Sequence, residues 1–234
     1  MWHSRPRLCG LPGSQAGAPV PHTNSTTQNF MTITAKMVSE LRDKTNAGMM
    51  DCKKALEEAK GDLAAAEVVL RKRGIATAAK KSGRAAKEGS IASYIHMGGK
   101  MGVLVEINCE TDFVAKTDSF REFVKDVALH IAAAKPVCVS REQVPADLIA
   151  RERDIARAQV KDKPAQIIEK IVDGKIEKFY STACLLEQAF IKNTDVTIKD
   201  HLTAKVSELG ENIVIKRFTV YELGQSPGDV TASA

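Results

Sequence analysis

The chain has 234 residues, of which 44% are hydrophobic, 27% charged and 5% aromatic. This apolar fraction excludes a disordered chain, and the apolar runs fall short of the roughly 18 residues that a membrane span needs. The length suits one large or two small globular domains. The net charge of +5 gathers clearly in one stretch only, which contains Lys80, Lys81, Arg84 and Lys87.

The five cysteines include no Cys-x-x-Cys pair and no nearby Cys/His cluster: Cys9, Cys52, Cys109, Cys138 and Cys184. Scattered cysteines of odd number predict a reducing compartment and argue against a zinc site. A single cysteine among aliphatic residues usually behaves as a small buried hydrophobe, so thiol chemistry is not needed to explain these positions. We expect no metal and no cofactor.

Residues 1–30 are predicted to be an unstructured extension outside the fold. They hold four of the eight prolines and no acidic residue, and they show no apolar period. An over-extended start with Met31 as the true first residue, a scar, or a transit peptide each explain this composition. Residues 225–234 are polar and predict a flexible tail.

Residues 31–75 show helical spacing in three short segments. Thr34 can cap the first helix, and Asp62 can cap a third helix that ends at Gly74. The second helix carries an apolar stripe made of Met49, Cys52, Leu56 and Ala59. Three such helices form a module with little core of its own, a size typical of a module that binds a partner.

Residues 76–89 connect this module to the rest of the chain. They consist mostly of Ala, Lys, Arg and Gly and carry no apolar stripe. The composition indicates a basic hinge or a solvated helix, and contact with RNA is the sharper interpretation of the same charges.

Residues 90–224 predict the main domain. A period of two in residues 91–96 and 103–107, separated by a Gly-Gly turn, indicates a β-hairpin. The helix that follows places Phe120, Phe123, Val124, Val127 and Ile131 on one face. Three more helices and one late strand are expected at residues 145–160, 164–179, 198–209 and 212–221. The predicted fold class is α+β, with an N-terminal three-helix module followed by a small antiparallel sheet covered by helices.

The sequence carries no recognisable catalytic motif. It lacks a phosphate-binding loop of the Gly-x-x-x-x-Gly-Lys-Ser/Thr type, a Gly-x-Ser-x-Gly elbow and a His-Glu-x-x-His helix. The five histidines are isolated from one another. An enzyme is therefore the less favoured class of function.

The stretch EINCETDFVAK, residues 106–116, leaves the strand period and places Phe113 and Val114 in a short connection before the next helix. In one interpretation Phe113 packs into the core while Asp112 or Thr111 bonds to backbone amides of the turn. In the other, the apolar tip contacts a partner. Spacing alone does not separate the two.

This stretch resembles the second signature of the elongation factor Ts family, the guanine-nucleotide exchange factors of bacterial translation elongation. Residues 41–56, which read LRDKTNAGMMDCKKAL, resemble the family's first signature. The two motifs occur in the family's order and spacing, and the resemblance covers residues 31–224. It also implies that the three-helix module is UBA-like.

The resemblance implies that the chain binds elongation factor Tu in its GDP form and ejects GDP. Asp112 and Phe113 match the family's Asp-Phe loop, whose aromatic ring wedges between helices of the partner and disturbs its magnesium site. Thr111 and Val114 flank these two residues. Magnesium demands near-ideal octahedral geometry, so a small displacement of its ligands weakens it and loosens the diphosphate.

The helical module resembles the part of the family that grips the partner's nucleotide domain. Four residues match its contact positions: Arg42, Met49, Met50 and Lys53. Met49 and Cys52 also suit the module's own core. Family members usually have glycine where this chain has Asn46, and since both tolerate positive φ we expect the turn to survive.

Many family members carry a second sheet-forming half and a coiled-coil insertion, and this chain resembles the short form. Unpaired edges of a short sheet favour self-association, so we expect a homodimer that engages two partner molecules. We also expect a cytoplasmic location, no membrane association and no direct binding of nucleic acid.

Two alternatives remain open. An RNA-binding adaptor would use the helical module and the basic hinge, and its binding would fall steeply with added salt. A small thiol enzyme would use Cys109, although nothing near it in sequence would activate the thiolate.

Overall fold

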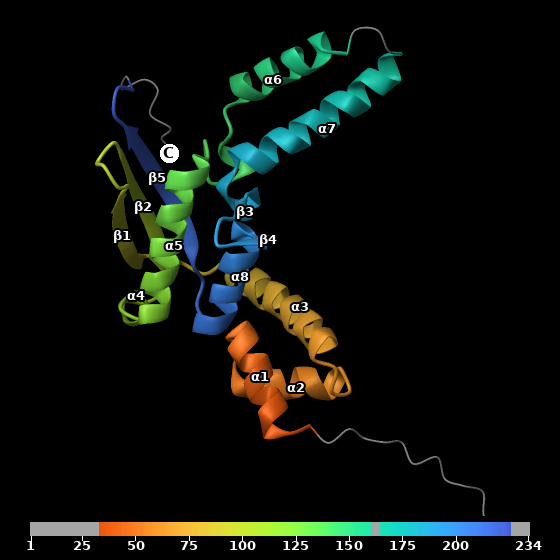
Figure 1. The fold of residues 1–234 in the computed structure, drawn as a ribbon, viewed down its shortest axis with the longest axis vertical. Helices are drawn as coiled ribbons and strands as arrows, with labels where there is room; N and C mark the ends of the chain where they lie inside the picture. The colour runs from red at the N-terminus through yellow and green to blue at the C-terminus, as the bar shows by residue number, and fades with distance from the viewer. Residues whose placement is uncertain (1–32, 161–163, 226–234) are drawn as a thin grey trace, which may run out of the picture. The chain divides into compact units, whose positions relative to one another are not determined.

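The computed structural model describes residues 33–160 and 164–225 (Figure 1). The predicted extension at residues 1–30 and all but the first residue of the predicted tail lie outside these ranges. The described chain has an α+β fold, which confirms the predicted class.

The N-terminal module contains α1 (Ala35–Thr45), α2 (Met49–Glu58) and the first part of α3 (Leu63–Lys81). As predicted, the Thr34 hydroxyl accepts from the Met37 amide, and the Asp62 carboxylate accepts from the amides of Ala64 and Ala65. These caps satisfy amides that the first turns leave unpaired. The module has a small core of its own, formed by Val38, Leu41, Cys52, Ala55, Leu56 and Ala66.

Helix α3 is longer than the sequence predicts, because it does not end at Gly74. Gly74 is buried, and a Cβ there would lie 3.8 Å from the Ser207 side chain on α8 (Ile198–Leu209). An Arg71–Asp200 ion pair of 3.0 Å joins the same two helices. Packing against α8 therefore carries the helix through its glycine to Lys81. The predicted hinge, residues 76–89, is therefore helical up to Lys81, and its last two residues begin strand β1.

The main sheet has the antiparallel order β1-β2-β5, formed by β1 (Glu88–Ile95), β2 (Met101–Cys109) and β5 (Val214–Glu222). The β1–β2 hairpin and the late strand confirm the predicted elements. Gly89 has a φ of 140°, and a Cβ there would lie 2.2 Å from the Ile107 carbonyl oxygen, so only glycine fits this crossing.

Helix α5 (Asp118–Ala134) lies along one face of this sheet (Figure 1). Its predicted apolar face is fully buried, since Phe120, Phe123, Val127 and Ile131 pack against inward-facing residues of β2 and β5. Val103, Val105 and Ile107 supply the inner face of β2. This larger core positions the loop that joins β2 to α5.

A second, two-stranded sheet was not expected from the sequence. It pairs β3 (Ala189–Phe190) with β4 (Asn193–Thr197), directly before α8. A strand of two residues is too short to show a period of two. Thr197 both ends β4 and begins α8 through a capping box with Asp200.

Helices α6 (Ala146–Ala158) and α7 (Ala165–Ala183) pack against each other as a hairpin (Figure 1). The sequence predicts both helices but not their pairing. Ala156, Val172 and Ile176 are buried between them, and Arg157 pairs with Glu169 at 3.1 Å. The chain thus carries an arm of paired helices that the comparison with longer family members did not anticipate.

Candidate functional site

The connection between β2 and α5 contains a short helix, α4 (Asp112–Ala115). The Thr111 hydroxyl caps it by accepting from the Val114 amide at 3.3 Å. The Thr117 hydroxyl then donates to the Val114 carbonyl at 2.7 Å and caps α5. Two caps within seven residues fix the backbone of this connection, which we call the exchange loop and define as residues 110–117.

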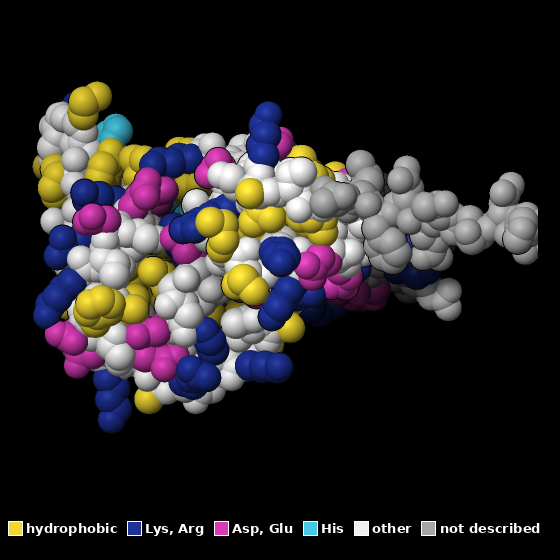
Figure 2. Space-filling view, turned by 90° about the horizontal axis from the view of Figure 1, so that it is seen from below, with side chains coloured by type: hydrophobic (Ala, Val, Ile, Leu, Met, Phe, Trp, Pro, Cys, Tyr) yellow, Lys and Arg dark blue, Asp and Glu magenta, His cyan; other side chains and the backbone are white. Residues whose placement is uncertain are grey.

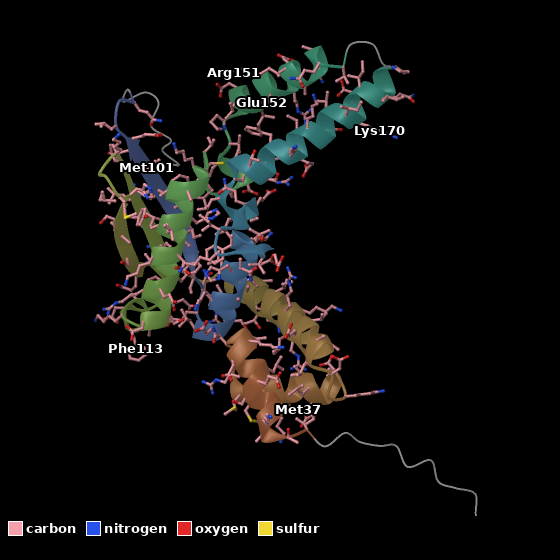
Figure 3. All side chains as sticks on the ribbon, in the orientation of Figure 1. Met37, Met101, Phe113, Arg151, Glu152 and Lys170 are labelled. Atoms are coloured by element: carbon pink, nitrogen blue, oxygen red, sulfur yellow. The ribbon has the colours of Figure 1, made fainter. Side chains whose placement is uncertain are left out.

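Phe113 and Val114 are adjacent but have opposite environments. The Phe113 side chain is 77% exposed, whereas Val114 is 6% exposed and belongs to the main core. Figure 3 shows Phe113 pointing away from α4 and the sheet. The interpretation that packs Phe113 into the core is therefore wrong. Val114 anchors the loop through its burial, and its contact with a partner stays a prediction.

Asp112 lies beside Phe113 on the exposed side of α4. Its carboxylate accepts from the Lys116 ammonium at 2.6 Å. This hydrogen bond and the charge of Lys116 lower the pKa of Asp112, so the carboxylate is ionised at neutral pH. The exposed tip of the exchange loop therefore combines an apolar ring with a fixed negative charge.

Glu211 holds the base of the exchange loop and was not identified from the sequence. One carboxylate oxygen accepts from the amides of Glu110 and Thr111 at 3.1 and 3.0 Å, and the other accepts from the Thr111 hydroxyl at 2.7 Å. Glu211 lies 100 residues from Thr111 along the chain. No local pattern marks it, because its partners are backbone groups of a distant turn.

The exchange loop and the segment before β5 hold each other through hydrogen bonds in both directions. The Glu110 carboxylate accepts from the Asn212 amide at 2.7 Å, and Asn212 donates from its side chain to the Arg84 carbonyl at 2.8 Å. Arg84 also lies 3.5 Å from Glu110 as an ion pair. The segment before β5 and the end of the predicted hinge thus brace the exchange loop from two sides.

The four module residues singled out in the sequence are all exposed. On α2, the Met49 and Met50 side chains are 53% and 63% exposed, whereas the nearby Cys52 is completely buried. Lys53 makes only a long pair with Glu57 at 4.0 Å, and Arg42 faces solvent on α1. Of the two residues that suited the module's core, Cys52 belongs to it and Met49 does not.

The turn between α1 and α2 is preserved. Asn46 adopts a φ of 52° and a ψ of 16°, the left-handed conformation, and its amide donates to the Arg42 carbonyl at 2.7 Å. Asparagine tolerates this region better than most residues, which confirms the expectation for this position.

The basic hinge offers little free charge for a nucleic acid at Arg84, which is paired with Glu110. Figure 2 shows one face of the molecule, on which basic and acidic side chains are interspersed and hydrophobic side chains lie between them.

Cys109 has no environment that would activate a thiolate. Burial and the nearby Glu211 raise its pKa, and its thiol donates to the Thr111 carbonyl at 3.1 Å. A reactive cysteine needs the opposite, an electropositive and accessible site. The thiol instead contributes to the base of the exchange loop.

The residues that the structure describes contain no group of three or more His, Cys, Asp or Glu side chains placed to hold a metal ion. None of their helices has both the length and the apolar character needed to cross a bilayer.

The chain is similar to known proteins over most of its length. The family model described as "Elongation factor TS" matches residues 25–225. The chain is 60% identical over 195 residues to elongation factor Ts of Carboxydothermus hydrogenoformans, covering 82% of this chain and 90% of the relative. It is 62% identical to that of Anaeromyxobacter sp. strain K, covering 82% and 89%, and 56% identical to that of Geobacter sulfurreducens, covering 83% and 91%. With an exposed Asp-Phe tip on a braced loop and matches of this extent, the chain belongs to the elongation factor Ts family.

Proposed function

We propose that the chain is a guanine-nucleotide exchange factor that binds elongation factor Tu in its GDP form and promotes the release of GDP during translation elongation. It makes and breaks no covalent bond, so it acts on a GTPase without being an enzyme itself. We expect it to work in the cytoplasm, where translation elongation takes place.

The observation that carries this proposal is the exposed ring of Phe113 on a braced loop. A large apolar side chain left 77% exposed beside a charged pair loses contact with water only when a partner covers it. The backbone beneath it is capped by Thr111 and Thr117 and tied to Glu211. A rigid support lets binding energy displace the partner's helices instead of bending the loop.

The displacement would act on the partner's magnesium site. Magnesium tolerates little departure from octahedral geometry at about 2.0–2.1 Å, so moving the helices that position its ligands weakens its binding. Without the metal the charge of the diphosphate is poorly neutralised, and GDP leaves. The ionised Asp112 would orient the wedge by accepting hydrogen bonds from partner amides, in competition with Lys116.

The helical module would provide a second contact. Met49 and Met50 offer exposed, flexible thioethers, and Arg42 and Lys53 offer positive charge beside them. We propose that this surface grips the partner's nucleotide domain, while residues 111–114, with Phe113 as the wedge, perform the displacement.

In thermodynamic terms the factor and GDP are two ligands with negative coupling on one protein. Reciprocity requires GDP to weaken binding of the factor by the same ratio, and a ~10⁴-fold effect needs about 5.5 kcal/mol of differential binding. GTP then enters because it is in excess.

Release of labelled GDP from elongation factor Tu tests the proposal. The natural chain should accelerate release, and Phe113→Ala should lose most of this acceleration, with Asp112→Ala reduced to a lesser degree. Met97→Ala is a matched control, because Met97 is also exposed but lies in the turn at the opposite end of the β1–β2 hairpin. Release no faster than the spontaneous rate with the natural chain would refute exchange activity. Full activity in both loop variants would refute only the wedge.

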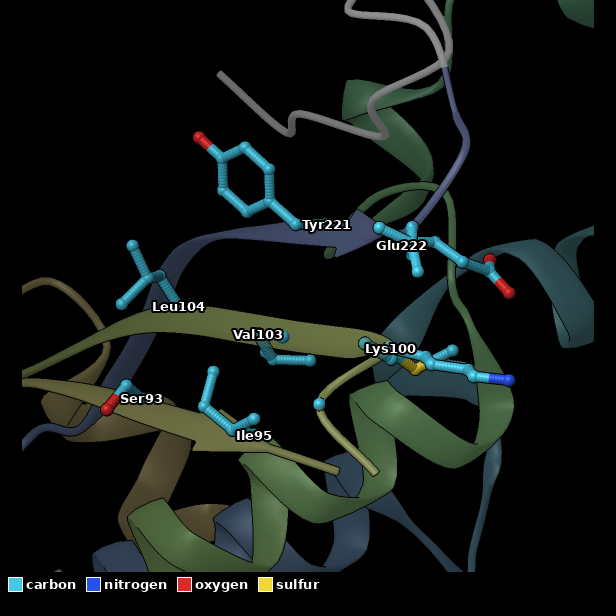
Figure 4. A pocket seen from close by; sticks show the side chains of 11 residues that line it. Ser93, Ile95, Lys100, Val103, Leu104, Tyr221 and Glu222 are labelled. Carbon is cyan, nitrogen blue, oxygen red and sulfur yellow. The ribbon is translucent and has the colours of Figure 1, made fainter. Parts of the chain in front are cut away.

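We further propose a homodimer formed through the main sheet. β1 and β5 are its two edges, and Ile95, Leu104 and Tyr221 are exposed on the face away from α5. Figure 4 shows these three side chains on one side of the sheet. They line a hollow of about 440 Å³. A second copy of the same apolar face would cover these side chains across a two-fold axis, where each surface meets its own equivalent.

Light scattering at working concentration measures this assembly. We expect twice the chain mass of 25.4 kDa, and the mass of one chain for Leu104→Glu. A single-chain mass for the natural protein would contradict the dimer and leave the exchange proposal standing.

A further inference from the structure

Two of the cysteines that are scattered in the sequence meet in the fold. Cys138 and Cys184 are 46 residues apart along the chain, and their Sγ atoms lie 3.8 Å from each other. Cys138 is 2% exposed and Cys184 is fully buried. Both are free thiols in a small apolar cluster with Val144, at the base of the α6–α7 hairpin.

The backbones at this point already have the geometry of adjacent strands. The two cysteines form an isolated parallel bridge, in which the Leu185 amide donates to the Cys138 carbonyl at 2.9 Å. The Cys138 amide donates to the Ala183 carbonyl at 3.3 Å. Neighbouring strands lie about 4.7–4.9 Å apart, which falls within the Cα separation of roughly 4.4–6.8 Å found in disulfides. Closing the bond needs the two sulfur atoms, now 3.8 Å apart, to approach to about 2.05 Å.

The position has a structural consequence. Residues 138–184 contain the whole α6–α7 hairpin, so a bond between these cysteines closes the hairpin into a covalent loop. Its base is already held by Arg141, which pairs with Glu177 at 2.7 Å and with Glu187, and lies 4.6 Å from the centre of the Tyr180 ring. The disulfide would add a covalent link to the ion pairs of Arg141 at the base of the hairpin.

We propose that Cys138 and Cys184 are a redox modification site that forms a reversible intrachain disulfide and locks the base of the α6–α7 hairpin. The oxidant is a small peroxide. The Cys138 thiolate attacks one oxygen of hydrogen peroxide, the O–O bond breaks, hydroxide leaves, and a sulfenic acid forms. The Cys184 thiolate then attacks that sulfur, the S–O bond breaks, and a second hydroxide leaves. The two thiol protons convert both hydroxides to water, so two thiols and one peroxide give one disulfide and two waters.

The order of attack follows from the environments of the two thiols. Burial raises the pKa of both, and for Cys184, which also feels the sulfur of Cys138, the pKa rises to about 12. The hydrogen bond between the two thiols lowers the pKa of Cys138 and raises that of Cys184, so Cys138 supplies the first thiolate. Because both thiols are buried, peroxide reaches them only when the base of the hairpin opens locally, so the reaction is slow and the site responds to sustained oxidation.

Peptide mapping of the natural chain tests the proposal without any substitution. After exposure to hydrogen peroxide sufficient to oxidise free glutathione in the same sample, the chain should lose about 2 Da and yield a peptide that links Cys138 to Cys184. Dithiothreitol should restore both thiols. The Cys138→Ala and Cys184→Ala variants should not form this link, whereas Cys52→Ala, which removes another buried thiol, should retain it.

Hydrogen exchange distinguishes a lock from an incidental bond. The oxidised chain should exchange amide hydrogens more slowly at the base of the hairpin, around residues 137–139 and 184–186, with no change in the helical module. The proposal fails if both thiols are still alkylated after denaturation of the peroxide-treated chain, if either cysteine links to another chain, or if the link forms without slowing exchange. These outcomes are independent of nucleotide exchange activity.

Discussion

The exchange loop and the helical module both expose apolar side chains, but they support them in different ways. The loop exposes one aromatic ring above a base that Glu211, Glu110 and Asn212 tie to the main core. The module exposes two unbranched methionines on helices whose core holds six buried residues. A braced aromatic ring suits a contact that must displace something, whereas flexible thioethers suit a contact that must adapt. The difference favours the proposed division, with displacement at the loop and grip at the module.

The largest effect is expected when the ring is removed. Phe113→Ala should reduce the coupling between the factor and GDP on elongation factor Tu by about 30-fold, equivalent to the roughly 2 kcal/mol of an aromatic hot spot. The affinity of GDP for the GTPase, measured with and without saturating factor, gives this coupling directly. If the variant binds elongation factor Tu more weakly but the coupling to GDP is unchanged, Phe113 contributes to binding alone. The loop and the module would then have the same role.

The next largest effect concerns the support of the ring. Glu211→Ala removes the acceptor of three hydrogen bonds and should lower the rate of GDP release by about 10-fold, although Glu211 need not touch the partner. Glu122→Ala is the matched control, since Glu122 is an exposed glutamate on α5. If Glu211→Ala retains full activity, the rigidity of the base is irrelevant to displacement.

A smaller and qualitatively different effect is expected in the module. Met49→Ala and Met50→Ala should each raise the factor concentration needed for half-maximal release by about 5-fold, while the maximal rate stays unchanged. Loss of partly exposed contacts weakens association without altering the displacement step. A fall in the maximal rate would mean that the module takes part in displacement.

The smallest expected effect is a difference in how the stability of the main core and of the module's core depends on pH. His130 is buried, with Nε2 at 2.9 Å from the Gln188 oxygen and Nδ1 accepting from the Ile191 amide at 3.3 Å. The side-chain nitrogen of Gln188 donates to the Thr182 carbonyl, so the side-chain oxygen of Gln188 faces His130. A neutral imidazole with its hydrogen on Nε2 therefore donates to Gln188 and accepts from Ile191, which satisfies both partners. Burial accordingly lowers the pKa of His130 below its ordinary value of 6.5.

The sign follows from proton uptake. Below about pH 6.5 the unfolded chain binds a proton at His130 that the folded chain does not, so the free energy of unfolding falls as the pH drops. Residues 33–81 contain no histidine. Acidification from pH 7.5 to 5.5 should therefore lower the protection factors of amide hydrogens, which are corrected for the intrinsic exchange rate, in the main core before the module. His130→Gln should weaken this dependence and His96→Gln, at an exposed position, should not; equal acid sensitivity in both cores would contradict the assignment.

Local signals in the sequence were sufficient for most elements. Thr34 and Asp62 cap helices as predicted, and the apolar stripe of α5 is buried throughout. These features depend on residues within one or two turns of each other, so their spacing along the chain is enough to identify them. The resemblance to the family also pointed to Asp112 and Phe113 through an unbroken motif.

Errors occurred where a distant segment decides the local structure. Helix α3 passes through Gly74 because α8 packs against it, and the pairing of α6 with α7 depends on both helices at once. The four-residue helix α4 has too few turns for residue spacing to show that Val114 faces the core while Phe113 faces solvent.

The sequence by itself determined the fold class, the caps, the hairpin and the motif that marks the exchange loop, because each is encoded by short-range periodicity or by contiguous residues. Only the tertiary structure decided that Phe113 is exposed, that Glu211 braces its loop and that Cys138 meets Cys184. Each of these depends on segments that are far apart in the chain and close in space. Burial and hydrogen bonding across such distances arise from packing of the whole core, which no local pattern records.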